Sequence, residues 1–164
     1  MKKDHHRQVG RAPDKACASA LDSAFRSLSR RDHTRKELAV KLRQKGFDRS
    51  AIAGALERCR ELGYLDDAKT AAIIAGHLAE NGYGPLRVRQ VLGQKGLDDA
   101  AIEQALVCCG DEKAQVLSAR RLLEKKASRL NREADPWKRR QKAYRILAGR
   151  GIASTVNKSA IADN

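Results

Sequence analysis

Apolar residues recur every three or four positions along most of this chain, and Gly, Asp or Pro interrupts the pattern at short intervals. Spacing of this kind predicts amphipathic helices, each burying one face. Alternating runs of β-branched residues, which are typical of half-buried strands, are missing from the sequence. The pattern therefore predicts an all-α protein.

The helical pattern is also repeated. Residues 42–48 read LRQKGFD and residues 92–98 read LGQKGLD, and nine of the 22 positions are identical when 35–56 is aligned with 85–106. A degenerate third copy lies at 147–153, where Gly and Ile occupy the matching positions. A repeat with this period predicts an array of similar units. We expect three three-helix, helix-turn-helix-like repeats in an elongated, curved array.

Helix-start and helix-stop residues place the boundaries of these repeats. We expect a disordered basic arm over 1–15, repeat 1 over 16–64, repeat 2 over 65–110 and a divergent repeat 3 over 111–164. In repeat 1 the first helix begins near Ala16. A capping box of Thr34 and Glu37 starts the second helix, and Asp48 caps the third, which runs to Leu62.

Repeat 2 follows the same plan. A helix capped by Asp66 or Asp67 runs to about Glu80, a second begins at Pro85, and a third extends from Asp98 to Cys109. In repeat 3 we expect one long helix over 111–130 and another over 136–150, whereas Ser154–Ser159 has a composition that forms a poor helix.

Positive charge recurs on one helix of each repeat. The chain has 34 Lys and Arg against 20 Asp and Glu, a net charge of +14, which predicts a polyanionic partner. The middle helices carry +4 (34–45), +3 (84–95) and +6 (136–150), while the third helices are neutral (48–62) or −3 (98–109). The candidate binding residues are Arg35, Lys36, Lys41, Arg43, Lys45, Arg87, Arg89, Lys95, Lys138, Arg139, Arg140, Lys142, Arg145 and Arg150.

A second interpretation of these cations is structural. They could form solvated faces, and Lys45, Lys95 and Arg150 could simply complement the negative ends of their helices. Residues 136–150 favour function, because that stretch contains no acidic residue, whereas a face that serves only solubility usually mixes charges of both signs.

The sequence offers no catalytic or metal-binding constellation. His5, His6, His33 and His77 are scattered, and no phosphate-binding glycine loop is present. None of the four cysteines forms a C-x-x-C pair, and Cys59 and Cys109 fall on apolar helix faces, which indicates reduced core thiols. We therefore expect a non-enzyme without metal or cofactor. No apolar run approaches membrane-spanning length, so we expect a cytoplasmic protein.

Three short helices that include a basic one suggest a helix-turn-helix, and a stand-alone DNA-binding protein is the alternative function. The basic helices lack a clear set of residues for base edges, no dimerisation segment is evident, and six aromatic residues offer few stacking platforms. We expect Phe47 and Tyr64 to be used in packing. A monomer that follows a long groove with a repeating negative lining fits these features better.

Three motifs give the chain a family resemblance. They are SRRDHTRKEL at 29–38, LGYLDD at 62–67 and GYGPLRVRQ at 82–90, the last followed by Gln94-Lys95-Gly96. In this order they resemble the signature of the bacterial RecX regulators. The structural positions of the motifs are Asp32, Gly46, Gly63, Tyr64, Asp66, Asp67, Gly82, Gly84, Pro85 and Gly96.

The resemblance implies a fold of tandem three-helix repeats. It also implies a modulator that binds in the groove of the RecA–single-stranded-DNA filament and lowers its ATPase, strand-exchange and co-protease activities. Expected partners are RecA and single-stranded DNA, with duplex DNA as a further candidate. Family members usually place an aromatic residue just after Asp67, where this chain has Ala68-Lys69-Thr70.

Overall fold

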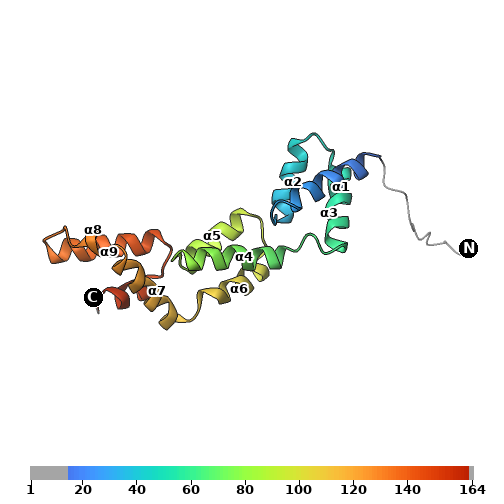
Figure 1. The fold of residues 1–164 in the computed structure, drawn as a ribbon. Coiled ribbons are helices and arrows are strands. Elements are labelled where there is room, and N and C mark those ends of the chain that lie inside the picture. The colour runs from blue at the N-terminus through green and yellow to red at the C-terminus, as the bar shows by residue number, and fades with distance from the viewer. Residues whose placement is uncertain (1–14, 163–164) are drawn as a thin grey trace, which may run out of the picture. The chain divides into compact units, whose positions relative to one another are not determined.

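The computed structural model describes residues 15–162, and this part of the chain is helical without a strand. The helices are α1 (Lys15–Leu28), α2 (Arg35–Gln44), α3 (Arg49–Glu61), α4 (Asp67–Glu80), α5 (Pro85–Gln94), α6 (Asp99–Leu106), α7 (Glu112–Glu124), α8 (Ala127–Leu130), α9 (Pro136–Gly149) and α10 (Ser154–Ala162) (Figure 1). The all-α, three-by-three plan is confirmed. The predicted arm, apart from its last residue Lys15, lies outside the described residues.

The first compact unit ends at Asp66 and contains α1, α2 and α3 packed on one another (Figure 1). Its core includes Ala24, Leu38, Leu56 and Cys59, all nearly or fully buried. The predicted capping box is present: the Glu37 N–H donates to Thr34 Oγ1, and the Thr34 N–H donates to Glu37 Oε2. These bonds satisfy amide groups that the first turn of α2 would otherwise leave unpaired.

The second compact unit, Asp67–Asn164, contains both remaining repeats. One core cluster lies among α4, α5 and α6 around Ala71, Leu92 and Ile102, and another gathers residues of α7, α9 and α10 around Leu123 and Leu147. Asp98, Asp111 and Asp135 cap α6, α7 and α9 through their side chains, as the sequence predicts for the first and last of these helices. α4 begins at Asp67, which leaves Asp66 directly before its first residue.

Two backbone turns join these two repeats. The Gly84 N–H donates to the Arg150 carbonyl oxygen at 2.8 Å, and the Leu86 N–H donates to the Gly151 carbonyl oxygen at 3.1 Å. A Cβ on Gly84 would lie 2.5 Å from that Gly151 oxygen, so the approach requires glycine. We call this contact between the α4–α5 turn and the α9–α10 turn the repeat joint. It fixes repeat 2 to repeat 3 at a point that no sequence pattern indicated.

Three expectations about the helices are corrected. The predicted helix over 111–130 is divided, because the chain turns at Lys125 and Lys126 before α8, and Leu130 then packs in the same core as Leu123. The Ser154–Ser159 stretch forms a regular helix, since burial of the apolar Val156 and Ala160 outweighs weak helix propensity. The third helix of repeat 2 ends in a 3₁₀ turn, Val107–Cys109.

Tyr64 and Phe47 are both used in packing, as expected, although the Tyr64 side chain is 61% exposed. Its ring meets the edge of Phe25 with centroids 5.3 Å apart, and Phe47 packs partly buried against the same core. Of the two predicted core thiols, Cys59 is fully buried and Cys109 is half-buried. Burial, with a smaller effect of Cys108, raises the pKa of Cys109 to about 11, which keeps that thiol protonated at neutral pH.

Gly96, the glycine that follows α5, tests whether a residue with positive φ is needed where this helix ends. Gly96 has a φ of +79°, whereas Gly93 is helical and has open space where a Cβ would lie. We expect Gly96→Ala to lower the free energy of unfolding by about 1 kcal/mol, because alanine is strained at positive φ. The matched variant Gly93→Ala should raise it by up to about 1 kcal/mol. Urea denaturation followed by circular dichroism measures both, and equal effects would contradict the assignment.

Candidate nucleic-acid interface

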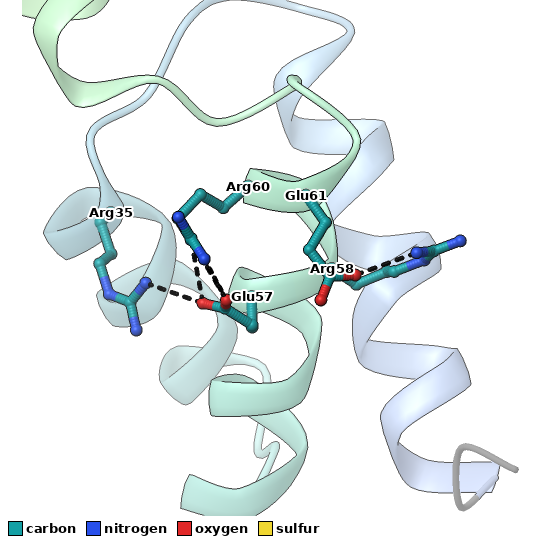
Figure 2. A network of polar contacts seen from close by, with 5 residues as sticks. All are labelled: Arg35, Glu57, Arg58, Arg60 and Glu61. Atoms are coloured by element: carbon teal, nitrogen blue, oxygen red, sulfur yellow. Dashed lines mark hydrogen bonds and ion pairs between the residues drawn. The ribbon is translucent and has the colours of Figure 1, made fainter. Parts of the chain in front are cut away.

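The cations of α2 are partly neutralised by the third helix of the same repeat. Arg35 Nη1 lies 3.8 Å from Glu57 Oε2 on α3, and Arg60 also binds Glu57 while Arg58 pairs with Glu61 (Figure 2). The hydrogen bond from Arg60 holds the pKa of Glu57 below its usual value, so this carboxylate stays charged at neutral pH. The surface of repeat 1 therefore alternates positive and negative groups.

The other predicted cations of repeat 1 differ in their surroundings. Lys45 Nζ donates to Ser23 Oγ on α1 at 2.5 Å, so this lysine ties α2 to α1. Lys36 and Arg43 are exposed, and Lys41 is half-buried. The ammonium group of Lys45 therefore has a partner inside the repeat, on another helix than its own.

In repeat 2 the charge is again offset by a neighbouring helix. Arg89 Nη1 binds Glu103 Oε1 of α6, and this contact lowers the pKa of Glu103 and raises that of Arg89. Arg87 Nη1 donates to the side-chain oxygen of Gln90 on the same helix at 2.7 Å. The acidic third helix seen in the sequence is therefore placed where it compensates α5.

The electrostatic surroundings of α9 in repeat 3 differ from those of α2 and α5. Among residues 15–162, no ion pair involves a residue of α9. The next helix, α10, contains no acidic residue, so it cannot neutralise α9 as α3 and α6 neutralise their partners. The cations of α9 are Lys138, Arg139, Arg140, Lys142 and Arg145.

The contacts that these cations make leave their charge in place. Arg139 Nε donates to the Glu133 carbonyl oxygen at 3.2 Å, and Lys142 Nζ donates to the Arg129 carbonyl oxygen at 3.3 Å. Arg145 donates to the side-chain oxygen of Gln141. Lys138, Arg140 and Arg145 are exposed, so α9 presents a surface of uncompensated positive charge.

Arg150, the last predicted binding residue, is used in the repeat joint. Its Nη1 donates to the Asn81 carbonyl oxygen at 2.7 Å, and its guanidinium carbon lies 4.4 Å from the centre of the Tyr83 ring. Such a hydrogen bond and cation–π contact connect the end of α9 to the α4–α5 turn. Arg150 therefore has a structural task that its position in the sequence did not reveal.

Two aromatic residues on α9 are functional candidates that the sequence reading missed. The Trp137 side chain is 65% exposed and Tyr144 is 38% exposed, although the sequence analysis expected few stacking platforms. A helical projection gives the signal that could have found them: residues 137 and 144 share a face, whereas the buried Ala143 and Leu147 define another.

The two described histidines lie in different repeats. His33 is buried in the turn before α2, with its Nδ1 atom 3.8 Å from Glu37 Oε2, and His77 is exposed beside Glu80 on α4. Within residues 15–162 no group of three His, Cys, Asp or Glu side chains could hold a metal ion. No helix in that range is both long and apolar enough to cross a membrane. His5 and His6 lie outside the described residues.

Models of one protein family match all three repeats. They are described as the first, second and third three-helix domains of RecX, and they match residues 20–59, 66–106 and 116–156. These segments cover most of the chain and follow the order of the repeats.

The individual proteins that are similar to this chain belong to the same family. The chain is 38% identical over 135 residues to a regulatory protein RecX of Xanthomonas axonopodis pv. citri, covering 80% of this chain and 79% of that one. It is 44% identical over 88 residues to the Pseudomonas savastanoi pv. phaseolicola protein, of which the match spans only 57%. The crystal structure of RecX from Lactobacillus salivarius shares the fold, with a TM-score of 0.80 at 23% identity over 90% of this chain and 96% of that chain.

Proposed function

The chain belongs to the RecX family of regulatory proteins, and from this premise we propose that it is a non-catalytic regulator of the RecA recombinase. In this proposal it binds the RecA–single-stranded-DNA filament as a cytoplasmic monomer. Binding lowers the ATPase, strand-exchange and co-protease activities of the filament, and so modulates recombination, DNA repair and the SOS response.

The observation that best supports a polyanionic partner is the uncompensated charge of α9. Basic helices recur in all three repeats, but acidic residues of the neighbouring helix offset those of α2 and α5. Only α9, within the described part of the chain, combines exposed cations with a third helix that lacks acids. A nucleoprotein filament carries closely spaced phosphates, which attract such a surface over several ångströms.

Part of the sequence-derived site is retained in the proposal. The filament-facing residues that we retain are Arg43, Lys138, Arg140 and Arg145, all of them exposed, with Lys36, Lys41 and Arg87 as flanking candidates. Lys45 and Arg150 have partners within the fold, and Arg35 and Arg89 have carboxylate partners, so we assign these four to structure. Arg139 and Lys142 tether α9 to the segment before it, and Lys95 remains a prediction.

A measurement of RecA ATPase activity tests the proposal. We expect the single-stranded-DNA-dependent rate to fall as the protein is added, because filament binding is proposed to restrain the recombinase. A control reaction without DNA separates this effect from nonspecific inhibition. An unchanged rate at a several-fold molar excess over RecA contradicts the proposed function.

A stand-alone DNA-binding protein remains the second candidate, since the charge of α9 would attract bare DNA as well. This candidate predicts tight, steeply salt-dependent binding to duplex DNA in the absence of RecA, together with no effect on the RecA ATPase. Equilibrium binding to a labelled duplex at two salt concentrations distinguishes the two functions.

A further inference from the structure

The outer face of α9 carries two exposed aromatic side chains among its cations. Trp137 lies in the first turn and Tyr144 seven residues later, so the two lie on one side of the helix, about 10 Å apart along its axis. Trp137 is 65% exposed and Tyr144 is 38% exposed, so both rings are accessible to a partner.

Both aromatic residues are held on defined backbone. The Trp137 N–H donates to Asp135 Oδ1 at 2.8 Å in the N-terminal cap of α9, which fixes the first turn. The hydroxyl groups of Tyr144 and Ser154 are 3.2 Å apart, which links that ring to the start of α10. The Tyr144 ring, held by this contact, loses little conformational freedom when a flat partner stacks on it.

Exposed cations flank the aromatic stripe on both sides. Arg140 is three residues after Trp137 and four before Tyr144, so it lies on one flank of the stripe. Lys138 and Arg145 are seven residues apart and lie together on the other flank. Asp135 is the nearest acid in sequence, and its carboxylate accepts the Trp137 and Lys138 amide hydrogens as the helix cap.

An acidic protein surface, duplex DNA or a single nucleic-acid strand could bind the positive charge of this face. Only the single strand would also contact its aromatic rings. An acidic protein surface pairs with cations and leaves the aromatic stripe without specific partners. Duplex DNA stacks its bases internally, so it presents phosphates but no free base faces. A single strand presents both, since every base has a π-face and every nucleotide a phosphate.

From this arrangement we propose that the outer face of α9 binds single-stranded nucleic acid directly, with bases stacking on Trp137 and Tyr144 and phosphates contacting Lys138, Arg140 and Arg145. This assignment rests on the proposed function in that it names the strand as the component of the filament that α9 contacts. It is independent of the recombinase in its physical basis and in its test.

Tryptophan fluorescence provides a site-specific readout, because Trp137 is the only tryptophan in the chain. Titration of the full chain with a thymidine oligonucleotide of about 20 nucleotides should quench this fluorescence in a saturable way, because a stacked base deactivates the excited ring. A duplex of the same length should quench it far less. Quenching should weaken as salt is raised, because phosphate contacts release counterions.

Variants separate stacking from charge. In anisotropy measurements with a labelled oligonucleotide, Trp137→Ala should weaken binding about tenfold or more, as expected for the loss of one base stack. Trp137→Phe should retain most of the affinity, since a ring remains. Val107→Ala, which truncates a side chain 79% exposed elsewhere in the same compact unit, should leave it unchanged. Circular dichroism confirms that each variant is folded.

Different experimental results would contradict this inference and the proposed function. Unchanged affinity of Trp137→Ala, equal quenching by duplex and single strand, or oligonucleotide binding without any fluorescence change overturns it. Inhibition of RecA by a protein that does not bind the oligonucleotide also overturns it, by moving the contact of α9 to the recombinase. Conversely, stacking on the oligonucleotide without any effect on RecA supports this inference and contradicts only the proposed function.

Discussion

Reversal of Lys138, Arg140 and Arg145 to glutamate is expected to weaken binding to the RecA–single-stranded-DNA filament by on the order of 100-fold at physiological salt. Three exposed cations that form no ion pair within residues 15–162 become three anions, and like charges brought together across an interface cost several kcal/mol. The salt dependence of binding should fall by about three counterions, one for each lost phosphate contact. Arg139 is left unchanged, because it donates to the Glu133 carbonyl oxygen before the helix.

A matched control makes the same change in net charge at another surface. Reversal of Lys113, Arg121 and Lys125, which are exposed on α7 or directly after it, changes the charge of the chain by the same amount. Fluorescence anisotropy with a filament assembled on labelled DNA, in a non-hydrolysable nucleotide, measures both variants. Equal loss of binding would show that overall charge matters and the location does not, and intact binding of the α9 variant would remove that helix from the interface.

Gly151→Ala should lower the free energy of unfolding of the second compact unit by roughly 3 kcal/mol. Gly151 has a φ of +71°, which costs alanine about 1–2 kcal/mol. A Cβ at this position would also overlap the backbone nitrogen and Cβ of Arg87, so the joint must open and lose its two backbone hydrogen bonds. Urea denaturation followed by circular dichroism measures the change.

The control for this prediction lies two residues away. Gly149 is in the last turn of α9, and a Cβ there would meet open space, so Gly149→Ala should leave stability unchanged or raise it slightly. Because repeat 2 and repeat 3 share the joint, Gly151→Ala should also separate one unfolding transition of this unit into two. Wild-type stability of Gly151→Ala would show that the joint contributes little.

The fold was predictable from sequence because its determinants are local. The capping box of Thr34 and Glu37, the side-chain caps Asp48 and Asp98 and the positive-φ glycines Gly46 and Gly96 each act within a few residues. The failures occurred where packing outweighed local preference. Burial of Val156 and Ala160 stabilises α10 in a stretch of weak helix formers, and α7 ends before the apolar pattern does.

The candidate site was predictable only in part. The sequence placed a basic helix in each repeat, and all three helices exist. It could not show that Glu57 approaches Arg35 (Figure 2) or that Glu103 approaches Arg89, because those residues lie 22 and 14 positions apart and meet only when two helices pack. The sequence placed Arg150 among the candidate binding residues. In the structure its guanidinium group contacts Asn81 and Tyr83 of repeat 2.

The sequence by itself determined the helical repeats, their start and stop residues, the family and the recurrence of positive charge, since each of these depends on neighbours within a few positions. Only the tertiary structure decided which charges remain uncompensated, that two repeats are joined through Gly84 and Gly151, and that Trp137 is left exposed among cations. The physical reason is that neutralisation and burial depend on which helix faces meet. Those faces come from residues far apart in the chain.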